Sequence, residues 1–66
     1  MIDARGRSCP EPVIMIKKAM ASGEAHYEIT VDNRVSVENV TRFAQHAGYT
    51  VTVETSGDDF IMSIDK

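Results

Sequence analysis

The sequence predicts a two-layer α/β (α+β) sandwich in which both helices lie on one face of a mixed four-stranded sheet. Two segments repeat apolar residues with the period of a helix, and the longer predicted strands alternate apolar and polar residues. The segments follow the order β-α-β-α-β-β. Because each helix has one apolar stripe and each longer strand one apolar face, both helices are expected on the same side of the sheet. A doubly wound sheet would require strands that are apolar on both faces.

The first three elements are a strand, a loop and a helix. A short strand is expected at residues 1–4, and a polar loop with a glycine follows at residues 5–8. The helix is expected at residues 10–20, because Pro10 suits the first helical position and Gly23 suits the end of a helix. Its apolar stripe consists of Val13, Met15, Ile16, Ala19 and Met20.

The middle of the chain predicts a strand and a second helix. Residues 26–32 alternate, and the side expected to face the core carries Tyr27, Ile29 and Val31. Ser36 is the predicted N-cap of the next helix, and Val35 and Val40 are expected to form a hydrophobic staple around it. Gly48 ends this helix. Its apolar stripe consists of Val37, Val40, Phe43, Ala44 and Ala47.

The last third of the chain predicts two strands joined as a hairpin. The strands are expected at residues 50–55 and 60–64, since both segments alternate apolar and polar side chains. The connection Ser56-Gly57-Asp58-Asp59 has the length and residue types of a hairpin turn. The pattern does not define the order of the strands in the sheet.

Length and composition restrict the function. A chain of 66 residues has room for one domain, residues 1–66, without a deep substrate pocket. Its net charge of −3 disfavours binding to nucleic acid. No segment is long and apolar enough to cross a membrane, and the first residues lack a secretory signal. One cysteine cannot form an internal disulfide, so nothing in the sequence requires an oxidising environment. The expected location is the cytoplasm, and the protein is expected to be a monomer.

Cys9 is the residue best placed for chemistry. Most lone cysteines are inert packing residues, but Cys9 follows a polar loop and precedes a helix, so it is predicted to be the N-cap and to face solvent. The positive end of the helix dipole favours a thiolate there, which lowers the thiol pKa. Arg5 and Arg7 are expected to add to this effect, and the Glu11 carboxylate to oppose it. We therefore expect a moderately lowered pKa.

The prolines on either side of Glu11 define which backbone groups are free at the start of the helix. Pro10 and Pro12 have no N–H, so the Glu11 amide remains as the local donor to the sulfur. Their rings also make the start of the helix rigid, which helps to present an exposed sulfur to a partner. The predicted site has Cys9 as its reactive residue, supported by Arg5, Gly6, Arg7, Pro10, Glu11 and Pro12.

Several reaction types are disfavoured by the residues that are missing. Pro12 stands where a Cys-x-x-Cys motif would have its second cysteine, which excludes a redox cycle within the chain. His26 and His46 lack the spacing of metal ligands, and no phosphate-binding glycine loop is present. No metal or cofactor is therefore expected. A catalytic Cys–His dyad can form only if the fold brings one of the histidines to Cys9.

The motif Cys9-Pro10-Glu11-Pro12, after a glycine loop and at the start of a helix, resembles the Cys-Pro-x-Pro signature of the TusA/SirA/YedF sulfur-carrier family. The resemblance extends over nearly the whole chain, with Asp3-Ala4-Arg5-Gly6 before the motif and Lys17-Lys18-Ala19 after it. Three further stretches are most similar to the N-terminal domain of the YedF branch, which is named for selenium metabolism: Val31-Asp32-Asn33, Glu38-Asn39-Val40 and Arg42-Phe43-Ala44.

This resemblance implies a sulfur carrier that holds a persulfide on Cys9 and has no cofactor. It also implies two kinds of protein partner, a donor of the cysteine desulfurase type and a sulfur acceptor, and it suggests a link to selenium metabolism. Two features depart from the family. Arg7 stands where leucine or another apolar residue is usual, and the second, C-terminal domain common in YedF-like proteins is absent from this sequence.

A second hypothesis belongs to a different class of function. The chain would be a non-catalytic regulatory or protein-interaction module that uses its sheet face or the basic start of its first helix. Such a module needs no ionised thiol. Persulfide formation on Cys9 therefore separates the two hypotheses.

Overall fold

The computed structural model of the protein describes residues 2–7 and 11–66. Six elements follow one another in the predicted order: β1 (Ile2–Asp3), α1 (Glu11–Met20), β2 (His26–Val31), α2 (Arg34–His46), β3 (Thr50–Ser56) and β4 (Asp59–Asp65). The first strand ends at Asp3, one residue before its predicted end, and Met1 lies outside the described residues. The predicted start of the first helix, Pro10, lies outside the described residues.

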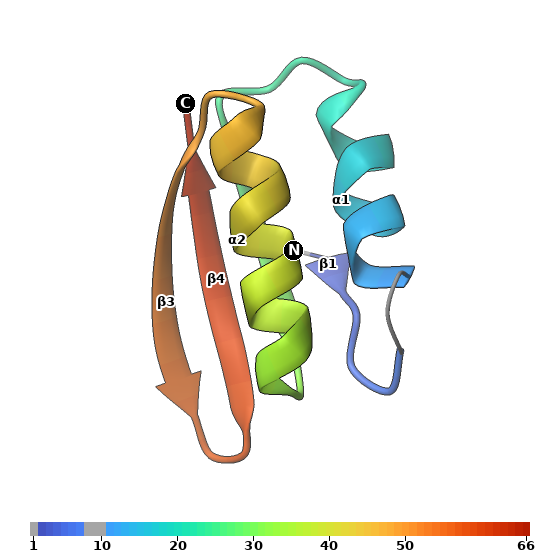
Figure 1. The fold of residues 1–66 in the computed structure, drawn as a ribbon, viewed down its shortest axis with the longest axis vertical. Helices are drawn as coiled ribbons and strands as arrows, with labels where there is room; N and C mark the ends of the chain where they lie inside the picture. Colours follow the sequence, from blue (N-terminus) through green and yellow to red (C-terminus); the bar gives the residue numbers. More distant parts are fainter. Residues whose placement is uncertain (1, 8–10) are drawn as a thin grey trace.

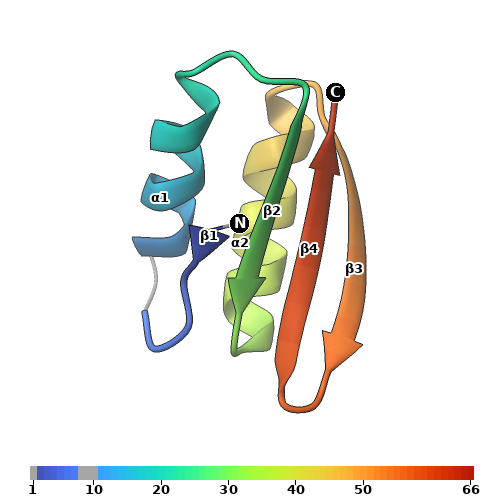
Figure 2. The same cartoon turned by 180° about the vertical axis from the view of Figure 1, so that it is seen from behind.

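The strands form one mixed sheet with the order β1-β2-β4-β3. β1 runs parallel to β2, and the β2–β4 and β3–β4 pairs are antiparallel. Both helices lie on the same face of this sheet, so the molecule has the predicted two layers (Figures 1 and 2). α2 packs over β3 and β4, and α1 packs beside it over β2. The other face of the sheet has no helix on it (Figure 2).

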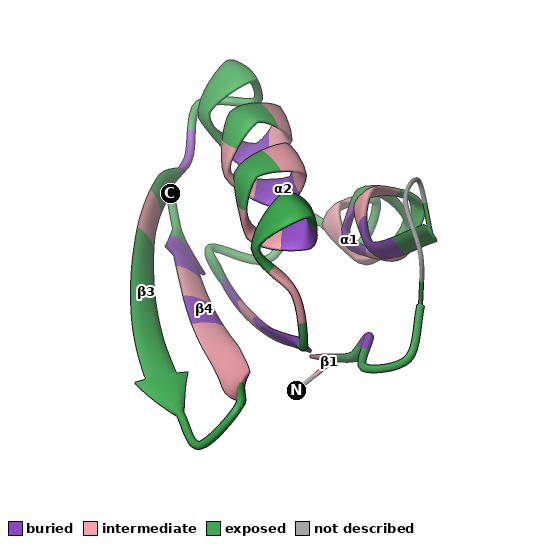
Figure 3. Ribbon diagram, turned by 60° about the horizontal axis from the view of Figure 1, so that its bottom comes forward, coloured by how far each residue is buried: buried purple, intermediate pink, exposed green. Residues whose placement is uncertain are grey.

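The core lies between the helices and the two central strands, β2 and β4. The alternation predicted for β2 is confirmed, because Ile29 and Val31 are fully buried and Tyr27 is nearly so. Met62 and Ile64 of β4 meet them in the sheet, opposite Ile29 and Tyr27 respectively. The helices cover these side chains with Ile16, Val40 and Ala44, all fully buried (Figure 3).

The start of α2 differs from the prediction. The N-cap is Asn33, not Ser36: Asn33 has extended backbone angles, and its side-chain oxygen accepts a hydrogen bond of 2.8 Å from the Ser36 amide. Ser36 is therefore the third residue of the helix and is only 2% exposed, and Val35 is 57% exposed and forms no staple. Asn and Ser cap equally well, and the apolar stripe is the same for either start, so the sequence pattern did not distinguish them.

The β3–β4 hairpin is tighter and longer than predicted. Ser56 and Asp59 pair with each other, so the turn consists of Gly57 and Asp58 alone. Gly57 has a φ of +62°, the left-handed conformation that a two-residue turn of type II′ requires at its first position. Each strand is therefore one residue longer next to the turn than predicted.

Candidate functional site

Residues 4–7, here called the Gly6 loop, lead from β1 toward Cys9. Ala4 is fully buried and its amide donates to the Thr30 carbonyl at 2.8 Å, which continues the pairing of β1 with β2. The Arg7 amide donates back to the Ala4 carbonyl at 3.3 Å and closes a four-residue turn. Gly6, the third residue of this turn, has a φ of +76°, which a type II turn requires there and which other residues adopt only with strain.

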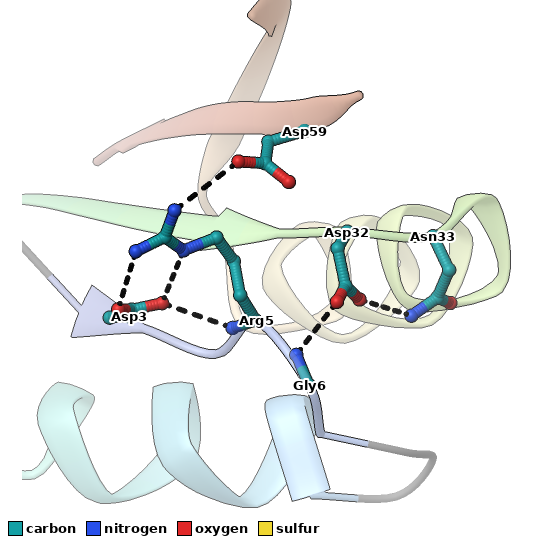
Figure 4. Close-up of polar contacts among 6 residues, drawn as sticks. All are labelled: Asp3, Arg5, Gly6, Asp32, Asn33 and Asp59. Carbon is teal, nitrogen blue, oxygen red and sulfur yellow. Dashed lines mark hydrogen bonds and ion pairs between the residues drawn. The ribbon is translucent and has the colours of Figure 1, made fainter. Parts of the chain in front are cut away.

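The Asp32 carboxylate connects the Gly6 loop to the start of α2. Asp32 Oδ2 accepts a hydrogen bond of 2.7 Å from the Gly6 amide, and Oδ1 accepts one of 3.1 Å from the Asn33 side chain (Figure 4). The hydrogen bond from the Gly6 amide is the main cause of the lowered pKa of Asp32, and the hydrogen bond from the Asn33 side chain is the second. Asp32 therefore stays ionised at neutral pH and holds the loop from the junction between β2 and α2.

Arg5 connects the same loop to the sheet. Its Nε and Nη2 atoms donate to the two oxygens of Asp3 at 3.0 and 3.1 Å, and its Nη1 reaches Asp59 Oδ2 at 3.4 Å (Figure 4). The hydrogen bonds from Arg5 lower the pKa of Asp3 to about 2, and those two carboxylates raise the pKa of Arg5. Segments far apart in the sequence, β1, the β2–α2 junction and the start of β4, thus converge on this loop.

The paired charges change the expected electrostatics of the thiol. Arg5 lies between two carboxylates, and Arg7 pairs with Glu11 at 3.4 Å. Each guanidinium is therefore compensated locally, and its long-range attraction for a nearby anion is reduced. The expected lowering of the Cys9 pKa then depends mainly on the start of the helix and less on Arg5 and Arg7.

Ser8, Cys9 and Pro10 lie outside the described residues. The predictions that Cys9 is the N-cap, that its sulfur is exposed and that Pro10 opens the helix therefore stay predictions. The described flanks agree with a helix that starts here, because α1 begins at Glu11 and the buried Pro12 lies in its first turn. A proline there has no intrahelical hydrogen bond to lose.

Two open grooves adjoin the flanks of Cys9. One, of about 240 Å³, runs along the outer side of α1 and is lined by Arg7, Glu11, Ile14, Met15 and Lys18. The other, of about 300 Å³, lies on the open face of the sheet and is lined by Asp3, Arg5, Thr30, Ser56, Asp59 and Ile61. Both are small and open and are lined in part by charged side chains, which suits contact with another protein better than enclosure of a substrate.

The two histidines lie at the other end of the molecule. His26 begins β2 and pairs with Asp65, whereas Gly6 is bound by Asp32, just after the opposite end of that strand. His46 is the last residue of α2, and Asn33, beside Asp32, caps its first turn. This placement gives a Cys–His dyad no support. Within residues 2–7 and 11–66, no group of histidines and carboxylates has the arrangement of a metal site.

Sequence reasoning identified Arg5, Gly6, Arg7, Glu11 and Pro12, and the structure gives each of them a place at the loop or the start of α1. It missed the carboxylates that hold the loop, which are Asp3, Asp32 and Asp59. Asp3 was detectable, since it lies two residues before Arg5. Asp32 and Asp59 are 26 and 54 residues from their partners, and only the sheet order brings them there.

The fold matches that of a solved structure. The crystal structure of a SirA-like protein from Desulfitobacterium hafniense superimposes with a TM-score of 0.82 and 40% sequence identity, over 97% of this chain and 92% of that one. The protein therefore has a SirA-like α+β fold. Within the described part of the chain, neither helix has the length and apolar character needed to span a membrane.

The sequence comparisons then define the family. The model of the family described as "Sulfurtransferase TusA" matches residues 1–66. A Methanocaldococcus jannaschii protein named "Putative sulfur carrier protein" is 40% identical over 55 residues, which cover 79% of this chain and 72% of that protein. The chain belongs to the TusA sulfurtransferase family, and these relatives support a sulfur-carrier role of the TusA type.

Proposed function

We propose that this protein accepts a sulfane sulfur as a persulfide on Cys9 and delivers it to an acceptor protein. The observation that carries the proposal is the position of the only cysteine in the sequence. Cys9 lies within three residues that connect a loop fastened at Gly6 and Arg5 to a helix that begins at Glu11. The carrier works as a monomer in the cytoplasm, where reducing conditions keep a lone thiol free.

The transfer consists of two exchanges at sulfur. The Cys9 thiolate attacks the terminal sulfur of a persulfide on the donor, a protein of the cysteine desulfurase type. A new S–S bond forms on Cys9, the donor's S–S bond breaks, and the donor leaves as a thiolate. A nucleophile of the acceptor then attacks the terminal sulfur, and Cys9 leaves as a thiolate. No net oxidant is consumed, because the sulfane sulfur keeps its oxidation level throughout.

A helix start suits both exchanges. The thiolate is the attacking species in the first step and the leaving group in the second, and both roles benefit from a moderately lowered thiol pKa. The Glu11 amide and the dipole of α1 supply this effect at the position of Cys9 in the sequence. A strongly lowered pKa would make the thiolate a poorer nucleophile. The Glu11 carboxylate disfavours the thiolate and so keeps the pKa of Cys9 from falling too far.

Mass spectrometry of the intact protein tests the proposal directly. Incubation with a cysteine desulfurase and cysteine is expected to add the mass of one sulfur atom, mapped to Cys9 and removed by a thiol reductant. Cys9→Ala is expected to fold normally by circular dichroism and to gain no mass. An untouched Cys9 in the wild-type protein contradicts the carrier function.

The same variant separates the carrier from an interaction module. If Cys9→Ala folds and still supports the biological role of the protein, the chain acts by binding alone.

The resemblance to YedF extends the proposal to selenium as an alternative cargo. A selenium donor in the same experiment would then add the mass of one selenium atom at Cys9.

A further inference from the structure

We propose that Asp32 is a positioning residue for sulfur transfer, which holds the Gly6 loop so that Cys9 meets protein partners in one fixed arrangement. This inference rests on the carrier function proposed above. Asp32 is 23 residues beyond Cys9 in the sequence, directly after β2, and it is not part of the Cys-Pro-x-Pro motif.

The contacts of Asp32 show why its orientation is fixed. Its Oδ2 accepts the Gly6 amide at 2.7 Å, the shortest hydrogen bond described around the Gly6 loop, and its Oδ1 accepts the Asn33 side chain at 3.1 Å. Because both oxygens are engaged, the carboxylate cannot rotate without breaking one of these bonds (Figure 4). Asn33 is itself held as the N-cap of α2. The loop is thereby tied to the end of a 13-residue helix.

Asp32 and Arg5 hold the loop from two different places in the fold. Arg5 binds Asp3 and Asp59 at the open face of the sheet, and Asp32 binds Gly6 from the junction between β2 and α2. The remaining backbone contact of the turn, from Arg7 to Ala4, is 3.3 Å long. Loss of Asp32 would therefore leave β1 paired with β2 but would release the side of the loop that leads to α1.

A released loop would slow transfer between proteins without changing the thiol itself. A partner that meets a mobile loop must order it on binding, and this entropic cost raises KM and lowers the fraction of productive encounters. A small alkylating reagent needs no such ordering, since it approaches the sulfur from any direction. The positioning role therefore predicts a split between the two kinds of reaction.

The experiment compares the wild-type protein with Asp32→Ala, Asp32→Asn and Val51→Ala. Asp32→Asn keeps an acceptor oxygen for the Gly6 amide. Val51→Ala removes a half-buried side chain of β3, away from the loop, and serves as a control of lowered stability. Three quantities are measured on each variant: hydrogen exchange of the Gly6 amide, the rate of iodoacetamide alkylation of Cys9, and kcat/KM for persulfide transfer from a cysteine desulfurase.

For Asp32→Ala we expect loss of protection of the Gly6 amide and a fall of about tenfold in kcat/KM, carried mainly by KM, with alkylation changed by less than about twofold. Asp32→Asn should recover part of both losses, and Val51→Ala should transfer at the wild-type rate. Unchanged transfer in Asp32→Ala, or an equal loss in Val51→Ala, overturns the positioning role while wild-type loading still supports the carrier function. Absence of a persulfide on the wild-type protein overturns both.

Discussion

Arg5 and Arg7 illustrate how the meaning of a residue depends on its partners. In the sequence they are two cations close to a reactive cysteine, but in the structure each is paired with a carboxylate. Arg5 bridges Asp3 and Asp59 and so fixes the backbone that precedes the site. Arg7, paired with Glu11 four residues further along the chain, compensates the carboxylate that is expected to oppose a thiolate at Cys9.

Glu11→Gln is expected to lower the pKa of the Cys9 thiol. The substitution removes a carboxylate two residues from Cys9 and leaves Arg7 without its partner, and both changes favour the thiolate. The Glu11 backbone amide is unchanged. The rate of alkylation measured against pH reports the pKa, with Glu54→Gln on β3 as the matched control. A midpoint that stays the same or rises would show that the Glu11 carboxylate does not act on the thiol.

Asp3 gives the protein a defined sensitivity to acid. Its pKa is lowered to about 2 by the hydrogen bonds from Arg5, against 3.8 for a free Asp, so its contribution to stability is complete above the ordinary value and is lost as the pH falls toward 2. Unfolding in urea at a series of pH values should show the free energy of unfolding decreasing over this window. Asp3→Asn should show a smaller decrease, and an identical slope in both proteins would contradict this assignment.

At the scale of the elements, α2 begins three residues earlier than its sequence pattern predicts. Asn33 supplies the cap, and Ser36 is carried into the helix, where its hydroxyl is buried without a hydrogen-bond partner among the described residues. A buried hydroxyl without a partner destabilises the folded state. The start of α2 thus combines a favourable cap with an unfavourable buried group.

Ser36→Ala is therefore expected to raise the free energy of unfolding by about 1 kcal/mol, because it removes the unpaired hydroxyl and introduces a better helix former. Asn33→Ala should lower it by about 1 kcal/mol, because the cap of the Ser36 amide is lost. Both changes are measured by chemical denaturation. If Ser36 were the true N-cap, Ser36→Ala would lower the free energy of unfolding and Asn33→Ala would change it little. The comparison therefore distinguishes the two caps.

The elements also show what the sequence can and cannot predict. The inward faces of β2 and β4 follow from alternation, because period two assigns each side chain to a face of the sheet. The order of the strands depends on which strand edges pair. The alternation within β2 does not say which strands lie beside it in the sheet. Asp32 and Asp59 therefore went unnoticed as partners of Gly6 and Arg5, whereas the roles predicted for Cys9, Gly6 and Glu11 rest on local sequence alone.

At the scale of the whole molecule, a small core depends on few side chains. Ile29 lies in a central strand, is fully buried and pairs across the sheet with Met62. Ile29→Ala should lower the free energy of unfolding by about 2–5 kcal/mol, a large part of the total for a small domain. Val53→Ala, at a position 40% exposed, is the matched control and should cost much less. Thermal unfolding of the two variants compares their losses of stability. Similar losses in both would show that Ile29 is not a central residue of the core.

Among the residues that the structure describes, β1 joins the sheet through two residue pairs, whereas β2 and β4 share six. The amino-terminal edge can therefore open in a partial unfolding event that leaves the rest of the sheet paired, with a free energy well below that of global unfolding. The Ala4 amide, bonded to Thr30, should exchange with solvent deuterium before the amides shared by β2 and β4. The Gly6 loop directly follows this short edge strand, so its contacts with Asp32 and Asp59 also help to keep the edge of the sheet closed.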